Sequence, residues 1–221
     1  MLRRGNERCV FECGFTLRAD HFAAFANEAL GGLAGLALGL AAENAFASLL
    51  AESGLRFVPV PGMPSSKPSA SFKLPGAEHL IVDLLIPGKE LGRIVEVREL
   101  GTHAQTIPLL DFLLEDPVDT VVLSPNQIVP VRVPAPERFV LHKLYSSESR
   151  RSAPGKSVKD REQAAILAAA LEDDLPGRLR HVWKSFPRAG RPAVARAAKA
   201  SAKLLTGRHA EGEAALQAVA G

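Results

Sequence analysis

The chain contains only two cysteines, Cys9 and Cys13, in its 221 residues. Their spacing matches neither the C-x-x-C pair of a redox motif nor half of a zinc site, and no matching cluster of cysteine and histidine follows. Disulfides are rare in the cytosol, so we expect two reduced thiols. The cysteine content therefore gives no support to a disulfide framework, a zinc site or thiol redox chemistry.

Long hydrophobic runs are also lacking. No segment reaches the roughly 18 apolar residues that a membrane span requires. Residues 29–42 come closest, but this segment is shorter and is interrupted by glycine. The basic start of the chain does not continue as a signal peptide, because acidic residues interrupt the pattern at Glu7, Glu12, Asp20 and Glu28. We therefore expect a cytoplasmic protein with no membrane partner.

Charge of either sign is not in large excess. The formal net charge is +3 and the pI is near 9.0, which allows contact with nucleotides or RNA without requiring it. A hydrophobic fraction of 47% is ordinary for a globular protein. The length fits one large domain, or a domain with a helical appendage.

Apolar periodicity and the positions of glycine and proline predict short strands and helices. Extended segments are expected at residues 55–60, 69–74, 78–87, 93–100, 118–123 and 128–133, and helices at 43–53, 106–115, 134–147, 157–171 and 175–186. Pro130 indicates an edge strand. The tail from Pro187 is rich in Ala, Arg and Lys, and predicts marginal helix that is solvated or weakly packed.

The chain is organised around the segment EHLIVDLLIP, residues 78–87, in which Asp83 is surrounded by aliphatic residues. Such a run is typical of a strand covered on both faces. A carboxylate there is costly unless it is paired, hydrogen-bonded or bound to a metal. Two interpretations stay open: an aspartate at a strand end satisfied by backbone donors, and a metal carboxylate at the mouth of a sheet.

Lys143 and Asp160 join Asp83 as candidates for phosphoryl chemistry. Nucleotidyl transfer needs carboxylates to hold Mg²⁺ and benefits from a cation that neutralises the transferred group. Each also has a structural explanation. Lys143 can extend from the boundary of an amphipathic helix to solvent, and Asp160 completes a capping box that begins at Ser157. A basic loop with Arg150, Arg151, Lys156 and Lys159 is either a solvated turn or a contact for phosphate or RNA.

Several motifs follow one another between residues 42 and 171. They are Phe57-Val58-Pro59-Val60-Pro61-Gly62, Ser71-Phe72-Lys73, Val82-Asp83-Leu84-Leu85, Leu109-Leu110-Asp111-Phe112-Leu113-Leu114, Val133-Pro134-Ala135-Pro136-Glu137-Arg138-Phe139, His142-Lys143-Leu144 and Lys159-Asp160. Together they resemble a bacterial family of nucleotidyltransferase-like domain proteins. The family is similar to the minimal nucleotidyltransferases that include AbiEii-type toxins of toxin–antitoxin systems. The resemblance implies an α+β, polymerase-β-like nucleotidyltransferase fold with a short mixed sheet flanked by helices.

The resemblance also implies chemistry. Mg²⁺ is the expected cofactor and a nucleoside triphosphate the expected substrate, with RNA or an antitoxin-like protein as further partners. Asp83 resembles the third metal carboxylate of the fold, Lys143 the helix lysine of the toxin-like members, and Asp160 the acid of their Lys-Asp motif. We therefore expect catalytic roles for these three. Residues expected to bind the nucleotide are Ser71, Lys73, Arg150 and Lys159.

One part of the family pattern is missing. An Asp-x-Asp pair should lie just before Ala41, but residues 29–40 contain no acid. Two Mg²⁺ ions about 3.5–4 Å apart need several carboxylates. The hypothesis is that the first 40 residues are out of frame or degenerate. The expected organisation is an atypical segment 1–41, a nucleotidyltransferase-like domain 42–172 and a helical extension 173–221. Two functions therefore stay open: Mg²⁺-dependent nucleotide transfer, and a non-catalytic role in binding nucleotide, RNA or a partner protein.

Overall fold

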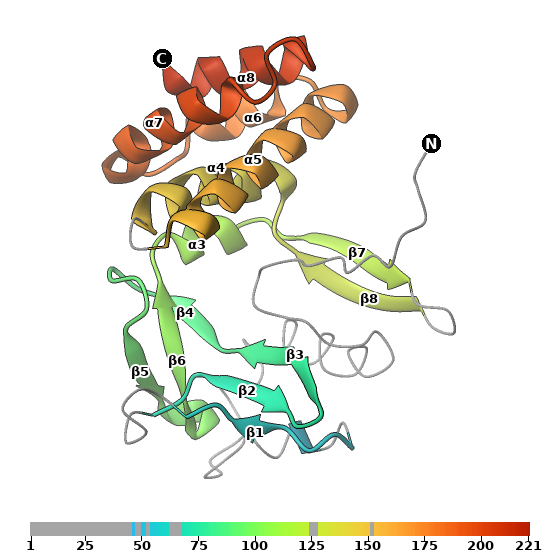
Figure 1. The fold of residues 1–221 in the computed structure, drawn as a ribbon, viewed down its shortest axis with the longest axis vertical. Coiled ribbons are helices and arrows are strands. Elements are labelled where there is room, and N and C mark those ends of the chain that lie inside the picture. Colours follow the sequence, from blue (N-terminus) through green and yellow to red (C-terminus); the bar gives the residue numbers. More distant parts are fainter. Residues whose placement is uncertain (1–45, 47–49, 52–53, 62–67, 124–127, 151–152) are drawn as a thin grey trace. The chain divides into compact units, whose positions relative to one another are not determined.

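The computed structural model describes the chain except residues 1–45, 47–49, 52–53, 62–67, 124–127 and 151–152, and it contains two compact units (Figure 1). The first unit contains the described residues up to Pro108, together with Asp119–Arg132. The second contains Leu109–Val118 and Val133–Gly221. Small mixed sheets combined with helices confirm the expected α+β class.

The first unit begins with a three-stranded antiparallel sheet in the order β1-β2-β3. The strands are β1 (Val58–Pro59), β2 (Ser71–Leu74) and β3 (Ala77–Asp83). The turn predicted at Pro75-Gly76 is present, and Gly76 adopts a φ of 81° that a glycine tolerates best. Phe72 and Val82 are paired across β2 and β3 and are both buried, where they pack with Phe46 and Leu50. These four residues form a small core on one face of the sheet.

The segment 78–87 is not one strand covered on both faces, so that prediction is wrong. β3 ends at Asp83, and β4 (Leu85–Pro87) belongs to a second sheet in the order β4-β6-β5. Val82 is fully buried whereas Ile81 is 37% exposed, as in a strand with one face toward the core. Leu84 joins the two sheets: its N–H donates to Ala70 O (2.8 Å), and its C=O accepts from Gln105 N (2.7 Å).

The second sheet contains a strand that we did not predict. Residues 102–107 form β6 (Thr102–Ile107), which pairs with β4 in parallel and with β5 (Ile94–Val97) in antiparallel fashion. The expected helix at 106–115 is shorter, because α3 spans Leu110–Leu114 only. In β6, burial alternates through Ala104 and Thr106, which is the period of a strand. The predicted strand pair is confirmed as β7 (Val118–Leu123) and β8 (Ile128–Val133), a two-stranded sheet in which Pro130 lies at an edge.

The second unit is a helical bundle. Its helices are α3, α4 (Pro136–Ser149), α5 (Pro154–Asp174), α6 (Arg178–Trp183), α7 (Arg191–Ala202) and α8 (Ala210–Ala220), with a 3-10 turn at Arg188–Gly190 (Figure 1). The helices expected at 134–147 and 157–171 are confirmed with shifted ends, whereas the helix expected at 175–186 is shorter, because α6 spans Arg178–Trp183 only. Pro136 occupies the first turn of α4, as predicted. In the described part of the chain, no helix has the combined length and apolarity needed to cross a bilayer.

The tail beyond Pro187 is packed, not solvated, so the expectation of weak packing is wrong. Val194 and Leu216 are fully buried and Val219 is 1% exposed, in one core with residues of α4 and α5. Small residues allow this approach: a Cβ on Gly212 of α8 would lie 2.8 Å from Ala169 Cα in α5. The expected boundary between residues 172 and 173 falls inside α5, and Leu171, just before it, shares this core with residues of the tail.

Candidate functional site

Asp83 is the last residue of β3, and its cross-strand partner is Ser71 of β2. The Ser71 hydroxyl donates a hydrogen bond to Asp83 Oδ1. Because side chains alternate along a strand, Ser71, Lys73 and Asp83 lie on the face of the sheet opposite the buried Phe72 and Val82. All three are half-buried. Three of the predicted site residues therefore share one polar face.

Of the two interpretations of Asp83, the structure supports features of each. It is a strand-end residue, as the first supposes, but the partner of its carboxylate is a side-chain hydroxyl. It is also open enough to accept another ligand, as the second supposes. Mg²⁺ is usually bound through one or two carboxylates together with water and phosphate oxygens. Asp83 therefore fits one such ion. A two-ion site is not supported by the described residues, among which no three His, Cys, Asp or Glu side chains gather.

Lys143, Asp160 and Arg150 form a buried ionic cluster in the second unit. Lys143 Nζ on α4 donates to Asp160 Oδ1 on α5 at 2.9 Å, and Arg150 Nη1 donates to Asp160 Oδ2 at 3.0 Å. The side chains of Lys143 and Asp160 are 5% and 1% exposed, whereas that of Arg150 is 29% exposed. Lys143 Nζ also lies 5.3 Å from the centre of the Phe139 ring. The cluster thus joins two helices and reaches the surface through Arg150.

This geometry overturns two structural explanations. Lys143 does not extend to solvent from a helix boundary, because it points into the helix pair and meets a carboxylate. Asp160 does not complete a capping box either. Helix α5 begins at Pro154, without a side-chain cap, and the hydroxyl of Ser157 donates to Ser147 O at 2.7 Å. Asp160 is held in the helix interior by two cations.

The ionic cluster sets what each member can do. Both carboxylate oxygens of Asp160 accept a charged donor, so the residue is occupied as long as the cluster is closed. A guanidinium has five N–H donors in a planar fork, and one of them is fixed by Asp160 here. Arg150 is thereby a positioned cation with donors to spare. Lys159, the remaining predicted nucleotide contact, lies on α5 and is exposed. Arg151 of the same basic loop lies outside the described residues.

Two ionic contacts near the start of α4 were not predicted as site residues. Glu137 is buried and accepts from Arg178 Nε at 2.7 Å. The hydrogen bond and the charge of Glu137 raise the pKa of Arg178 above its ordinary value. Arg138 is buried as well and donates to Phe112 O, Glu115 and Asp116. The available signal was the run PAPERF, where two adjacent charged residues enter a helix whose next turn is apolar.

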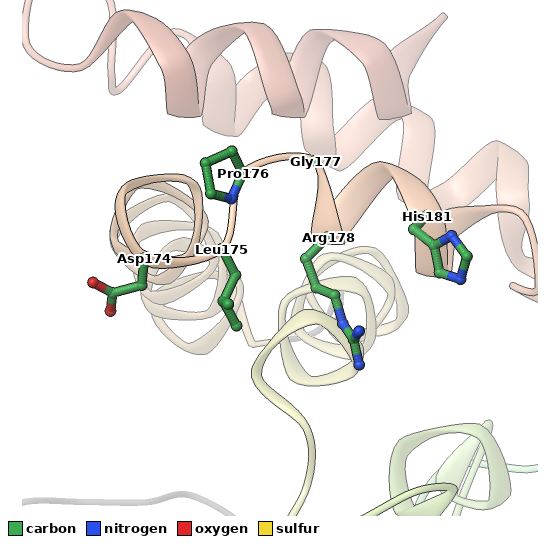
Figure 2. A pocket seen from close by; sticks show the side chains of 6 residues that line it. All are labelled: Asp174, Leu175, Pro176, Gly177, Arg178 and His181. Carbon is green, nitrogen blue, oxygen red and sulfur yellow. The ribbon is translucent and has the colours of Figure 1, made fainter.

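A shallow hollow of about 370 Å³ lies where α5 connects to α6 (Figure 2). Its lining is Asp174, Leu175, Pro176, Gly177, Arg178 and His181. Asp174 follows Asp160 by 14 residues on the same helix. At 1.5 Å per residue, the hollow is therefore about 20 Å from the ionic cluster. Arg178 is already paired with Glu137, and none of the predicted site residues lines the hollow.

The predicted site residues thus fall into two groups. Ser71, Lys73 and Asp83 lie in the first unit, and Lys143, Arg150, Lys159 and Asp160 lie in the second. The expectation that Asp83 converges with Lys143 and Asp160 stays a prediction. The segment 1–41 and the expected position of the Asp-x-Asp pair lie outside the described residues.

Comparison with known proteins gives one result. The family model described as Nucleotidyltransferase matches residues 34–187, about 70% of the chain. No curated protein and no solved structure was found to match. The match includes both groups of predicted site residues and extends beyond residues 42–171 on each side. Members of the family generally use a nucleoside triphosphate and a divalent metal ion. The chain therefore belongs to this nucleotidyltransferase family.

Proposed function

We propose that this nucleotidyltransferase binds a nucleoside triphosphate with Mg²⁺ and transfers a nucleotide to an acceptor. The observation that carries the proposal is the polar face of the first sheet. There the half-buried Asp83 lies beside the Ser71 hydroxyl, and Lys73 follows two residues further along the same strand. A carboxylate, a hydroxyl and an ammonium group on one face suit a metal–phosphate ligand.

In this proposal Asp83 holds a single Mg²⁺ together with phosphate oxygens and water. The ion, when bound, neutralises charge on the phosphates. Ser71 fixes the Asp83 carboxylate by donating to one of its oxygens, which leaves the other oxygen for the ion. Lys73, on the same face, is suited to a phosphate oxygen that the metal leaves uncovered. These roles use three residues of one rigid strand pair.

Asp160 is proposed as a positioning residue for Arg150 and Lys143. Its carboxylate is 1% exposed and both oxygens are occupied, so its contribution is to hold two cations in place. Arg150 keeps further N–H donors and partial exposure, which suits phosphate recognition. Lys159, which is exposed on α5 next to Asp160, is a second candidate for phosphate recognition.

A non-catalytic relative is the second candidate function. It is favoured by one observation, namely that no three metal-ligating side chains gather among the residues the structure describes. Such a protein would bind nucleotide, RNA or an antitoxin-like partner without turnover. Reading the encoding DNA in its other two frames upstream of Ala42 tests the related frameshift hypothesis. An Asp-x-Asp codon pair in either frame supports it, and absence from both frames rejects it.

The proposed function is tested with the purified chain, each of the four α-labelled nucleoside triphosphates, and RNA or protein acceptors, with and without Mg²⁺. We expect a labelled acceptor that depends on Mg²⁺ and is lost in Asp83→Asn. The matched control is Asp119→Asn, which removes an exposed acid of the same unit whose partner is Arg132. Equal labelling by both variants would reject the role of Asp83.

Nucleotide binding separates the two candidate functions. Binding of a fluorescent nucleoside triphosphate that requires Mg²⁺ and Asp83, without transfer to any acceptor, supports the non-catalytic relative. Absence of both binding and transfer rejects the transferase and also a non-catalytic relative that binds nucleotide. If Asp160 is a positioning residue, Asp160→Asn should weaken binding of the triphosphate but leave binding of the nucleoside without phosphates nearly unchanged. A purely structural role would weaken binding of both ligands equally.

A further inference from the structure

Positive charge is concentrated in one part of the chain. The 36 residues 175–210 contain nine Lys and Arg and no Asp or Glu. The whole chain has 27 basic and 24 acidic residues, so the remainder holds 18 basic residues and all 24 acids. The segment therefore carries a formal charge of +9, and the rest of the chain −6. The small net charge of +3 conceals this separation.

Three of these nine cations are used within the helical bundle. Arg178 pairs with Glu137, Arg196 pairs with Glu148 at 3.0 Å, and Arg191 donates to backbone carbonyls and lies over the Trp183 ring. The other six are exposed, and their side chains form no ion pair with any described residue. They are Arg180, Lys184, Arg188, Lys199, Lys203 and Arg208.

The fold places part of this charge on one side of a helix. Arg196, Lys199 and Lys203 are spaced i, i+3 and i+7, which is one face of α7 and its continuation. The opposite face is buried at Val194, Ala197, Ala198, Ser201 and Ala202, and packs against α4, α5 and α8. α7 lies alongside α8 at one side of the bundle (Figure 1). The basic stripe therefore faces away from the core.

We propose that the basic stripe of α7 and its continuation, in which Lys199 and Lys203 are exposed, forms a binding surface for the phosphate backbone of a polynucleotide. Charge complementarity is the argument: unpaired Lys and Arg on a rigid support are what sequence-independent polynucleotide binding uses. A lipid surface fits less well. A basic amphipathic helix binds a bilayer by inserting its apolar face, and that face of α7 is already buried in the core.

This surface deepens the proposed function by naming the acceptor as a polynucleotide. Its role as an acceptor site rests on nucleotide transfer, whereas the binding itself does not. If transfer fails while polynucleotide binding persists, only the proposed function is rejected. If transfer to a small molecule or a protein occurs without polynucleotide binding, only this inference is rejected.

The test is fluorescence anisotropy of a labelled 20-nucleotide single-stranded RNA between 50 and 200 mM salt. The variant is Lys199→Gln with Lys203→Gln, and the control removes two exposed cations of the first unit, Arg56→Gln with Lys89→Gln. Gln preserves helix propensity. Single-strand contacts contribute about 0.7 each to the salt slope, so the Lys pair should lower the slope by about 1.4 and the affinity by roughly 25-fold at 0.1 M salt.

The control variant should bind RNA nearly as the unaltered chain does. Equal weakening of the two variants, or no weakening of the Lys199/Lys203 variant, would overturn the inference. Two further ligands test the class of partner: vesicles containing phosphatidylserine, and polyglutamate of matched charge. One of these ligands could bind at least as tightly as RNA, with the same loss of affinity in the Lys199/Lys203 variant. That result would assign the surface to this class of partner and overturn the inference of a polynucleotide.

Discussion

Neutralising Asp160 should destabilise the helical bundle more than any exposed charge change. The Asp160 carboxylate accepts from Lys143 Nζ at 2.9 Å and Arg150 Nη1 at 3.0 Å, and its side chain is 1% exposed. In Asp160→Asn, the two cations keep their proximity but lose the anion between them. Breaking a buried ion pair from one side costs about 3–5 kcal/mol.

The lower end of that range applies here. Lys143 is buried at 5% exposure and cannot reach water without moving, but Arg150 is 29% exposed and can turn toward solvent. We therefore expect a loss of about 3 kcal/mol in the free energy of unfolding. For a chain of this length, that corresponds to a fall in Tm of roughly 6–12 °C. Urea unfolding followed by circular dichroism measures the first quantity, and a thermal scan the second.

A double-mutant cycle makes the reasoning refutable. The double variant Lys143→Met/Asp160→Leu removes both buried charges. Its loss of unfolding free energy should be smaller, by about 1–3 kcal/mol, than the sum of the losses in Lys143→Met alone and Asp160→Leu alone. The control is Glu162→Gln, which neutralises an exposed acid on the same helix and should change stability by less than about 0.5 kcal/mol. The reasoning fails if Asp160→Asn costs as little as this control, or if the double change costs the full sum.

Two further predictions concern packing and pH. Leu216→Ala should lower the free energy of unfolding by urea by about 2–5 kcal/mol, because the side chain is fully buried in the shared core. The control Leu204→Ala, at a residue 42% exposed, should lower it much less. Similar small losses in both variants would mean that the tail is weakly packed. Arg178→Gln should lower stability by an amount that is equal at pH 7 and pH 9. Glu137 raises the pKa of Arg178 above its ordinary value. The stabilisation from the charge of Arg178 is therefore fully present below that ordinary pKa and is lost only as the pH rises through the raised pKa. A loss of unfolding free energy in Arg178→Gln that is smaller at pH 9 than at pH 7 would contradict this.

The helices were predictable from the sequence because their signals are local. Pro136 at the start of α4 and the apolar spacing along α5 depend on neighbours within one or two turns. β6 was missed because Thr106 and Ile107 precede the leucines of α3 and share a helical spacing with them. The strand is fixed by pairing with Leu85–Pro87 and Ile94–Val97, which periodicity within residues 102–107 cannot reveal.

In the candidate site too, local patterns were readable from the sequence whereas contacts between distant elements were not. That Asp160 meets Lys143 follows from packing between α4 and α5, and the competing capping box was a valid local pattern until Pro154 was seen to begin the helix. The burial of Glu137 and Arg138 was equally non-local, since their partners Arg178 and Glu115 lie on other elements. The weak packing predicted for the tail underestimated how closely alanine and glycine let helices approach.

Leu84 gives the first unit a mechanical property. This residue, immediately after Asp83, donates its N–H to Ala70 O just before β2 and accepts through its C=O from Gln105 N in β6. A ligand bound to Asp83 therefore acts next to the residue whose two backbone hydrogen bonds connect the sheets, and we expect these two bonds to open together. Amide hydrogens of Leu84 and Gln105 should accordingly exchange with solvent in a single opening event, which ligation of the neighbouring carboxylate would make rarer for both.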